Sequence, residues 1–177
     1  MRKLRWLHRI VCVVLIAVCL TGCSDPSDKL RSSLNRYERI TRGDIPSDIQ
    51  LTIYYMHPKI FTQIPLSIEG IKNFPATEKI VVSAEELAPY WEDFRKLNSS
   101  VLQPIEEEPR LDVRLYYVLE TSTSQKLLEV VTNDVNCNFF VNGIEVEYNS
   151  LFIELIWPFL PEDARTMYPR DTVTGTD

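Results

Sequence analysis

Residues able to act as nucleophiles, proton shuttles or metal ligands are few in this chain. The histidines and cysteines are His8, His57, Cys12, Cys19, Cys23 and Cys137. A Ser-His-Asp or Cys-His catalytic set in the body of the chain would have to use His57. A zinc site would have to combine His57, Cys137 and carboxylates, and the chain contains neither H-E-x-x-H nor C-x-x-C spacing to support one. His57 precedes a proline at the end of an expected strand, where an exposed turn residue is the ordinary explanation. We therefore expect no catalytic residue and no metal ligand.

Motifs for other reaction classes are missing too. The chain contains no G-x-S-x-G, S-x-x-K or D-x-D-x-D-G pattern, and its five glycines are too scattered for a phosphate-binding loop. Glu106, Glu107 and Glu108 could bind a divalent cation weakly, but a run beside Pro109 is usually a solvated loop. We expect no cofactor. Glycoside hydrolysis survives as an enzyme class, because its two carboxylates can lie far apart in sequence.

The amino terminus combines a basic segment with a short apolar run. Residues 1–9 carry four basic side chains and no acidic one, and residues 10–20 are all apolar. A membrane-spanning helix needs about 20 apolar residues, which is more than this run supplies. A signal sequence for export fits better, because its apolar core is shorter.

Leu20, Thr21, Gly22 and Cys23 follow that run directly. This stretch resembles the lipobox of bacterial lipoprotein precursors, and the resemblance covers only about the first 25 residues. It implies that Cys23 receives a diacylglycerol thioether and that the chain is cleaved between Gly22 and Cys23. The protein would then be anchored by lipid on the extracytoplasmic side of a cell membrane, where two acyl chains hold it stably.

The alternatives at this segment are an ordinary signal peptide, with Cys23 a chance thiol, and an uncleaved anchor. In lipoproteins of diderm bacteria, an aspartate directly after the lipidated cysteine often favours retention at the inner membrane. Here that position is Ser24, with Asp25 one residue later. The choice between inner and outer membrane therefore stays open.

Composition bounds the rest of the protein. Removal of residues 1–22 leaves 155 residues, enough for one domain, and changes the net charge from −6 to −10. An acidic body disfavours nucleic acid and direct electrostatic docking to membranes, although solubility is the simpler reason for such a charge. Cys137 is the one cysteine left besides Cys23, so no internal disulfide is expected. In its apolar run we expect it to be a buried small side chain rather than a nucleophile.

Turn signals and hydrophobic periodicity divide the body into segments. Residues 23–48 are predicted to hold the lipidated cysteine and a polar tether. Within this tether the helical spacing of Leu30, Leu34, Tyr37 and Ile40 is compatible with a short helix. Residues 50–56 and 79–82 are predicted strands, and the segment between them is predicted to be a loop with at most a short helix over residues 67–73. Ser83 and Glu86 have capping-box spacing, and the apolar stripe Leu87, Trp91, Phe94, Leu97 and Val101 continues from them as a helix that Pro89 interrupts.

The second half of the body is predicted to be a meander. Residues 111–120 alternate between apolar and other side chains, which predicts a strand with one buried face, and residues 126–132 pair back against it. Asn142-Gly143 predicts a type I′ hairpin turn between residues 139–141 and 144–146. A helix over 151–157, capped by Asn149-Ser150, and a helical turn opened by Pro161 follow. We expect residues 168–177 to form a frayed tail.

The predicted fold class is α+β, as a single domain over residues 49–167. Its antiparallel sheet has about five to six strands, with two principal helices packed on one face. The chain has three aromatic doublets, Tyr54-Tyr55, Tyr116-Tyr117 and Phe139-Phe140. Neighbouring residues of a strand point to opposite faces of the sheet, so each doublet puts one ring in the core and one on the other face. The rings on this other face would form a binding patch if the face were open to solvent, but we favour a face that is covered.

The first functional hypothesis is a non-catalytic binding or interaction domain held at the membrane through Cys23, with a protein or glycan partner in the cell envelope. A small envelope hydrolase that uses paired carboxylates is the second hypothesis. The third is an inhibitor or immunity-type protein that turns its acidic surface to a basic partner.

Overall fold

The computed structural model describes residues 25–57, 59–105, 112–132 and 139–168. The strands are β1 (Ile49–Met56), β2 (Thr77–Ser83), β3 (Leu115–Thr121), β4 (Lys126–Thr132), β5 (Phe139–Val141) and β6 (Ile144–Val146). The α-helices are α2 (Pro26–Thr41), α3 (Ile68–Asn73), α4 (Ala84–Leu87), α5 (Trp91–Lys96), α6 (Leu151–Glu154) and α7 (Glu162–Met167). Two 3₁₀ turns, η1 (Ala88–Tyr90) and η2 (Trp157–Phe159), complete the described elements.

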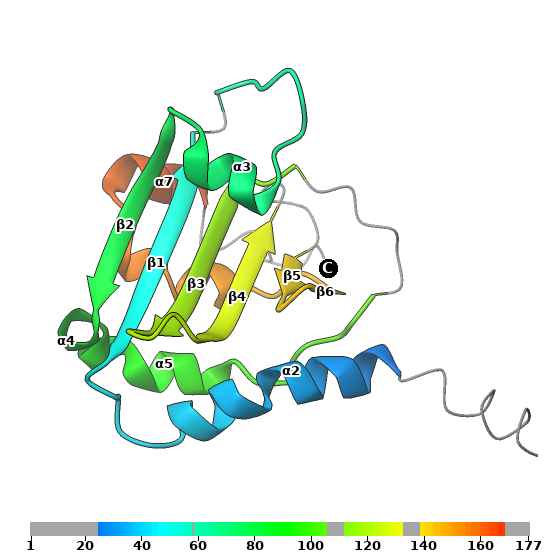
Figure 1. Cartoon of the computed structure of the whole chain (residues 1–177), viewed down its shortest axis with the longest axis vertical. Helices are drawn as coiled ribbons and strands as arrows, with labels where there is room; N and C mark the ends of the chain where they lie inside the picture. The colour runs from blue at the N-terminus through cyan, green and yellow to red at the C-terminus, as the bar shows by residue number, and fades with distance from the viewer. Residues whose placement is uncertain (1–24, 58, 106–111, 133–138, 169–177) are drawn as a thin grey trace, which may run out of the picture.

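The six strands form one antiparallel sheet in the order β2-β1-β3-β4-β5-β6 (Figure 1). The predicted α+β domain is confirmed. The Asn142-Gly143 hairpin is confirmed as well, because both residues have the positive φ values, 51° and 80°, that this turn requires. The capping box at Ser83 and Glu86 is also present.

The larger core lies on one face of the sheet. Alternate strand residues such as Leu51, Leu119 and Val130 pack there against buried side chains of α2, α4, α5, α6 and α7. The predicted interruption at Pro89 is confirmed, because the helical segment is divided there into α4, η1 and α5. Leu87, Trp91, Phe94 and Leu97 are buried as predicted, whereas Val101 lies beyond the helix and is 41% exposed.

The second face of the sheet is covered in part by α3 (Figure 1). Ile71 of α3 packs there with Tyr116 and Phe140, and both rings are buried. The prediction of one buried face for the strand that follows residue 111 was therefore wrong, since β3 buries Tyr116 and Val118 as well as Tyr117. Tyr54, which lies beside Tyr116, stays half-buried.

The expected tether is wrong over residues 26–41, which form α2, a helix of 16 residues. Asp25 caps it by accepting a hydrogen bond from Ser27 N, and Pro26 occupies its first position, where the missing N–H costs nothing. Leu30, Leu34 and Tyr37 form an apolar stripe that is buried in the main core. The domain therefore includes α2. The expected frayed tail also begins too early, because Tyr168 is buried; residues 169–177 lie outside the described part.

Candidate interaction site

An apolar loop projects from one end of the sheet between β1 and α3 (Figure 1). We define it as residues 59–66, Lys-Ile-Phe-Thr-Gln-Ile-Pro-Leu. The Phe61 side chain is 91% exposed and Ile64 is 71% exposed, the two largest exposures among the large hydrophobic side chains of the described chain. Burial of one such side chain would stabilise the protein by about 1.5–3 kcal/mol, and this loop leaves two of them in water. The loop is therefore the strongest candidate for a contact surface.

The base of the apolar loop is fixed by Arg114 and Asp112, which directly precede β3. The Arg114 guanidinium donates to Ile60 O at 3.2 Å and to Thr62 Oγ1 at 3.1 Å, and it pairs with Asp112 Oδ2 at 2.6 Å. Asp112 Oδ1 accepts from Leu66 N at 3.0 Å, and Val113 N donates to Leu66 O at 2.9 Å. The loop thus has a defined shape, which lowers the entropy that binding must remove.

Replacing Arg114 by methionine is expected to loosen the apolar loop while the sheet stays folded. The change removes three side-chain contacts to the loop and its base and keeps the aliphatic length of the side chain. We expect chymotrypsin to cleave after Phe61 about tenfold faster, because cleavage needs local opening of the loop. Lys126→Met is the control, since it removes a Lys126–Glu129 ion pair of β4 and should leave that cleavage rate unchanged. Equal cleavage of the Arg114 variant and the wild type would contradict the clamp.

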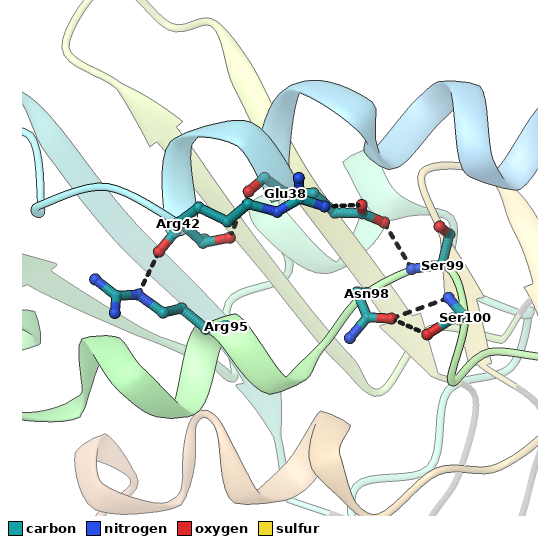
Figure 2. A pocket seen from close by; sticks show the side chains of 7 residues that line it. Glu38, Arg42, Arg95, Asn98, Ser99 and Ser100 are labelled. Atoms are coloured by element: carbon teal, nitrogen blue, oxygen red, sulfur yellow. Dashed lines mark hydrogen bonds and ion pairs between the residues drawn. The ribbon is translucent and has the colours of Figure 1, made fainter.

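The second candidate is a polar pocket of about 220 Å³ between α2 and the segment after α5 (Figure 2). It is lined by Glu38, Thr41, Arg42, Arg95, Asn98, Ser99 and Ser100. Glu38 Oε1 accepts from Ser99 N at 2.8 Å, and Glu38 Oε2 pairs with Arg42 at 3.3 Å. Arg95 donates to Thr41 O at 2.6 Å and to Gly43 O at 2.9 Å.

These contacts identify the pocket as a helix junction. Arg95 satisfies carbonyl oxygens at the end of α2, which a helix leaves without intrahelical partners. The Ser100 hydroxyl donates to Asn98 Oδ1, so it faces an amide and not a base. An activated serine needs a neighbouring base, and the lining holds no histidine or lysine. The contacts of the pocket support stability rather than catalysis.

The single histidine of the described chain has a local role. His57 Nδ1 accepts a hydrogen bond from Lys59 N at 3.1 Å, which shapes the start of the apolar loop. Within the described residues, no three His, Cys, Asp or Glu side chains come together in a way that would hold a metal ion. The expected lipidation site Cys23, the cleavage residue Gly22, Cys137 and residues 106–108 lie outside the described part, so the structure does not place them.

Many carboxylates of the described chain serve structural contacts. Glu78 Oε2 accepts from the Tyr55 hydroxyl at 2.6 Å, and Glu129 Oε2 accepts from the Tyr116 hydroxyl at 3.1 Å. Burial first, and the neighbouring carboxylate next, raise the pKa of both tyrosines, so their hydroxyls stay protonated as donors. Asp93 and Glu92 pair with basic residues one turn along α5. These contacts single out no carboxylate pair for hydrolysis.

The aromatic doublets do not form the alternative contact surface. Tyr116 and Phe140 are buried in the cluster that includes Ile71 of α3, and the ammonium groups of Lys72 and Lys79 stand over the Tyr116 and Tyr54 rings at 4.9 Å and 5.5 Å. The apolar loop was not singled out from sequence. Its one signal was a set of three large apolar residues, Ile60, Phe61 and Ile64, in a segment bounded by Pro58 and Pro65 that is too short to form its own core.

The described residues contain no helix with the length and apolar character needed to span a membrane. No protein-family model, curated protein or solved structure matches this chain, so the interpretation of the site rests on its own residues.

Proposed function

We propose that this chain is a lipid-anchored extracytoplasmic lipoprotein whose domain binds a partner in the cell envelope without catalysing a reaction. Cys23 carries the lipid, and the domain begins at α2, three residues later. The observation that carries the binding role is the exposure of Phe61 and Ile64 on a loop clamped by Arg114. An ordered loop that presents large apolar side chains is typical of an interface, where such residues act as anchors.

The chemistry of the apolar loop favours a protein partner over a glycan. Phe61 and Ile64 offer apolar contact area, whereas a glycan needs several fixed hydrogen-bond partners. The loop also lies at the end of the sheet opposite α2 (Figure 1). If the lipid holds the α2 end at the bilayer, the loop faces away from that bilayer. A protein with an apolar pocket to accept Phe61 therefore fits this site best.

Site-specific cross-linking tests the proposed interface in cells. A photoreactive phenylalanine analogue at position 61 is expected to give one discrete cross-linked product, because the ring inserts into the partner. The same analogue at position 101 is the control, since Val101 is also exposed but lies outside the apolar loop. Ile64→Ser should reduce the product at position 61 about tenfold, because it removes the second anchor.

Two results would contradict this function. A smear of products that is equal at positions 61 and 101 would show that the loop meets no particular partner. Turnover of a cell-wall substrate that is lost on neutralising one acidic residue would show that the domain is a hydrolase.

A further inference from the structure

The outward face of α2 differs in charge from the rest of the described domain. Five basic and two acidic residues lie between Pro26 and Arg42, whereas the other described residues include eight basic and 17 acidic ones. The basic residues of this segment are Lys29, Arg31, Arg36, Arg39 and Arg42, of which Arg36 is half-buried and the other four are exposed. We call this set the basic face of α2. The α2 segment is therefore net positive, whereas the rest of the described domain is net negative.

The pairing within α2 leaves part of that charge uncompensated. Asp28 lies 3.9 Å from Arg31, and Glu38 lies 3.3 Å from Arg42. Lys29 and Arg39 are exposed, and no described acidic side chain lies within ion-pair distance of either. Asp25 and Asp44 flank the helix at its two ends, and Asp25 is engaged at the N-cap. The outward face thus keeps a net positive charge over its middle turns.

A lipid on Cys23 would bring the start of α2 close to the membrane. Pro26 is the third residue after Cys23, so a lipid on Cys23 would hold the helix start within about 10 Å of its attachment point. That distance equals about one Debye length, so charges there are still felt by headgroups. A net-acidic domain is repelled by an anionic surface, and the orientation of lowest energy puts its basic helix next to the lipid and its acidic remainder away from it.

We infer that α2 lies on the bilayer that holds the anchor and that its basic face binds anionic phospholipid headgroups. This inference rests on the proposed lipid anchor at Cys23. The docked helix fixes the domain in one orientation, so the apolar loop at the opposite end of the sheet faces away from the membrane (Figure 1). The net charge of the whole protein conceals this surface, because it averages α2 with the acidic remainder.

Lysine footprinting on vesicles tests the orientation. The acylated mature protein is placed in vesicles of pure phosphatidylcholine or of phosphatidylcholine with 30% phosphatidylglycerol and treated with a water-soluble amine-reactive reagent. Lys29 is expected to react about fivefold more slowly on the anionic vesicles, and the difference should disappear in 0.5 M salt. The exposed Lys59 and Lys126 are internal controls and should react equally on both.

A charge variant tests whether Lys29 is protected by the charge of the basic face or only by its closeness to the lipid. Arg31→Gln with Arg39→Gln should abolish the protection of Lys29, because two charges leave the face while helix propensity changes little. The matched control, Lys79→Gln with Lys126→Gln, removes two exposed charges elsewhere and should keep it. Equal Lys29 reactivity on both vesicles would overturn the inference. Protection of Lys59 in its place would show that the apolar loop lies on the bilayer.

The mass of the purified protein tests the anchor independently. If Cys23 proves unmodified, the proposed anchor fails, and the footprint is repeated with the chain from Cys23 coupled through its thiol to a maleimide lipid in a Cys137→Ser background. Protection of Lys29 on this lipid-coupled chain would still support binding of the basic face to anionic headgroups. Unprotected Lys29 on this chain would overturn the inference, whatever the outcome for the natural anchor.

Discussion

Replacing Leu34 by alanine is expected to lower the free energy of unfolding by about 3–5 kcal/mol. Leu34 is fully buried at the centre of the apolar stripe of α2, and the loss of a buried leucine costs transfer free energy plus the energy of the cavity that remains. A domain of this size has a total stability of about 5–15 kcal/mol, so this single change removes a large fraction of it. Urea unfolding followed by circular dichroism measures the difference.

The matched control for Leu34 is Asn35→Ala on the exposed side of the same helix. Asn35 is exposed, and alanine has the higher helix propensity, so stability should change by no more than about 0.5 kcal/mol. The comparison separates packing of α2 from its intrinsic helicity. An unfolding curve of Leu34→Ala that matches the wild type would mean that α2 is a detachable tether after all.

Contacts beyond Leu34 indicate why α2 belongs to the domain. The Tyr37 hydroxyl donates to Phe94 O at 2.6 Å, and burial raises the pKa of this phenol, so it stays a donor. Asn142 Nδ2 donates to Ser33 O at 3.0 Å, while Asn142 Oδ1 accepts from Glu129 N at 2.8 Å. One hairpin residue thus joins α2 to β4.

Local signals predicted the elements that depend on local chemistry. Asn142-Gly143 forms its turn because both residues adopt positive φ more readily than other residues, and Ser83 and Glu86 form the capping box because the contacting atoms lie within one turn. Neither feature needs a distant partner. The antiparallel sheet followed from the short turns that connect its successive strands.

The errors concern features that depend on distant residues. The spacing of Leu30, Leu34 and Tyr37 was visible in the sequence, but their burial depends on side chains such as Phe94, which lie far along the chain. The polar composition of the surrounding segment therefore favoured a tether. The burial of Tyr116 likewise depends on α3, which crosses the second face of the sheet.

The candidate site was missed for a related reason. Pattern arguments assume that large apolar residues are buried, so Phe61 and Ile64 carried no signal of exposure. Arg114 was noted in the sequence only as part of an alternating strand pattern, whereas in the structure it fixes the apolar loop. Its role depends on Ile60 O and Thr62, more than 50 residues earlier in the chain.

Replacing Cys23 by alanine is expected to abolish both the lipid attachment and the signal-peptide cleavage of this protein. Without the thiol no diacylglycerol can be attached, and cleavage after Gly22 by a lipoprotein-type peptidase should fail. Metabolic labelling with a fatty-acid analogue is expected to fall to background. Mass spectrometry should find the wild-type chain starting at an acylated Cys23 and the variant without acyl groups. Cys137→Ser is the control and should keep both the label and the cleavage.

The same variant separates the two contributions to membrane binding. Each buried methylene contributes about 0.8 kcal/mol, so two acyl chains outweigh the roughly 1 kcal/mol that each basic residue of α2 adds near an anionic surface. The chain that starts at Ser24, made without signal peptide or lipid, should therefore bind anionic vesicles weakly and leave them as salt rises, whereas the acylated protein should stay bound. Fatty-acid labelling of Cys23→Ala, or a wild-type chain that retains its first 22 residues, would show that the lipobox assignment is wrong. Salt-resistant binding of the unacylated chain would instead place a second apolar contact on the bilayer, for which Phe61 and Ile64 are the exposed candidates.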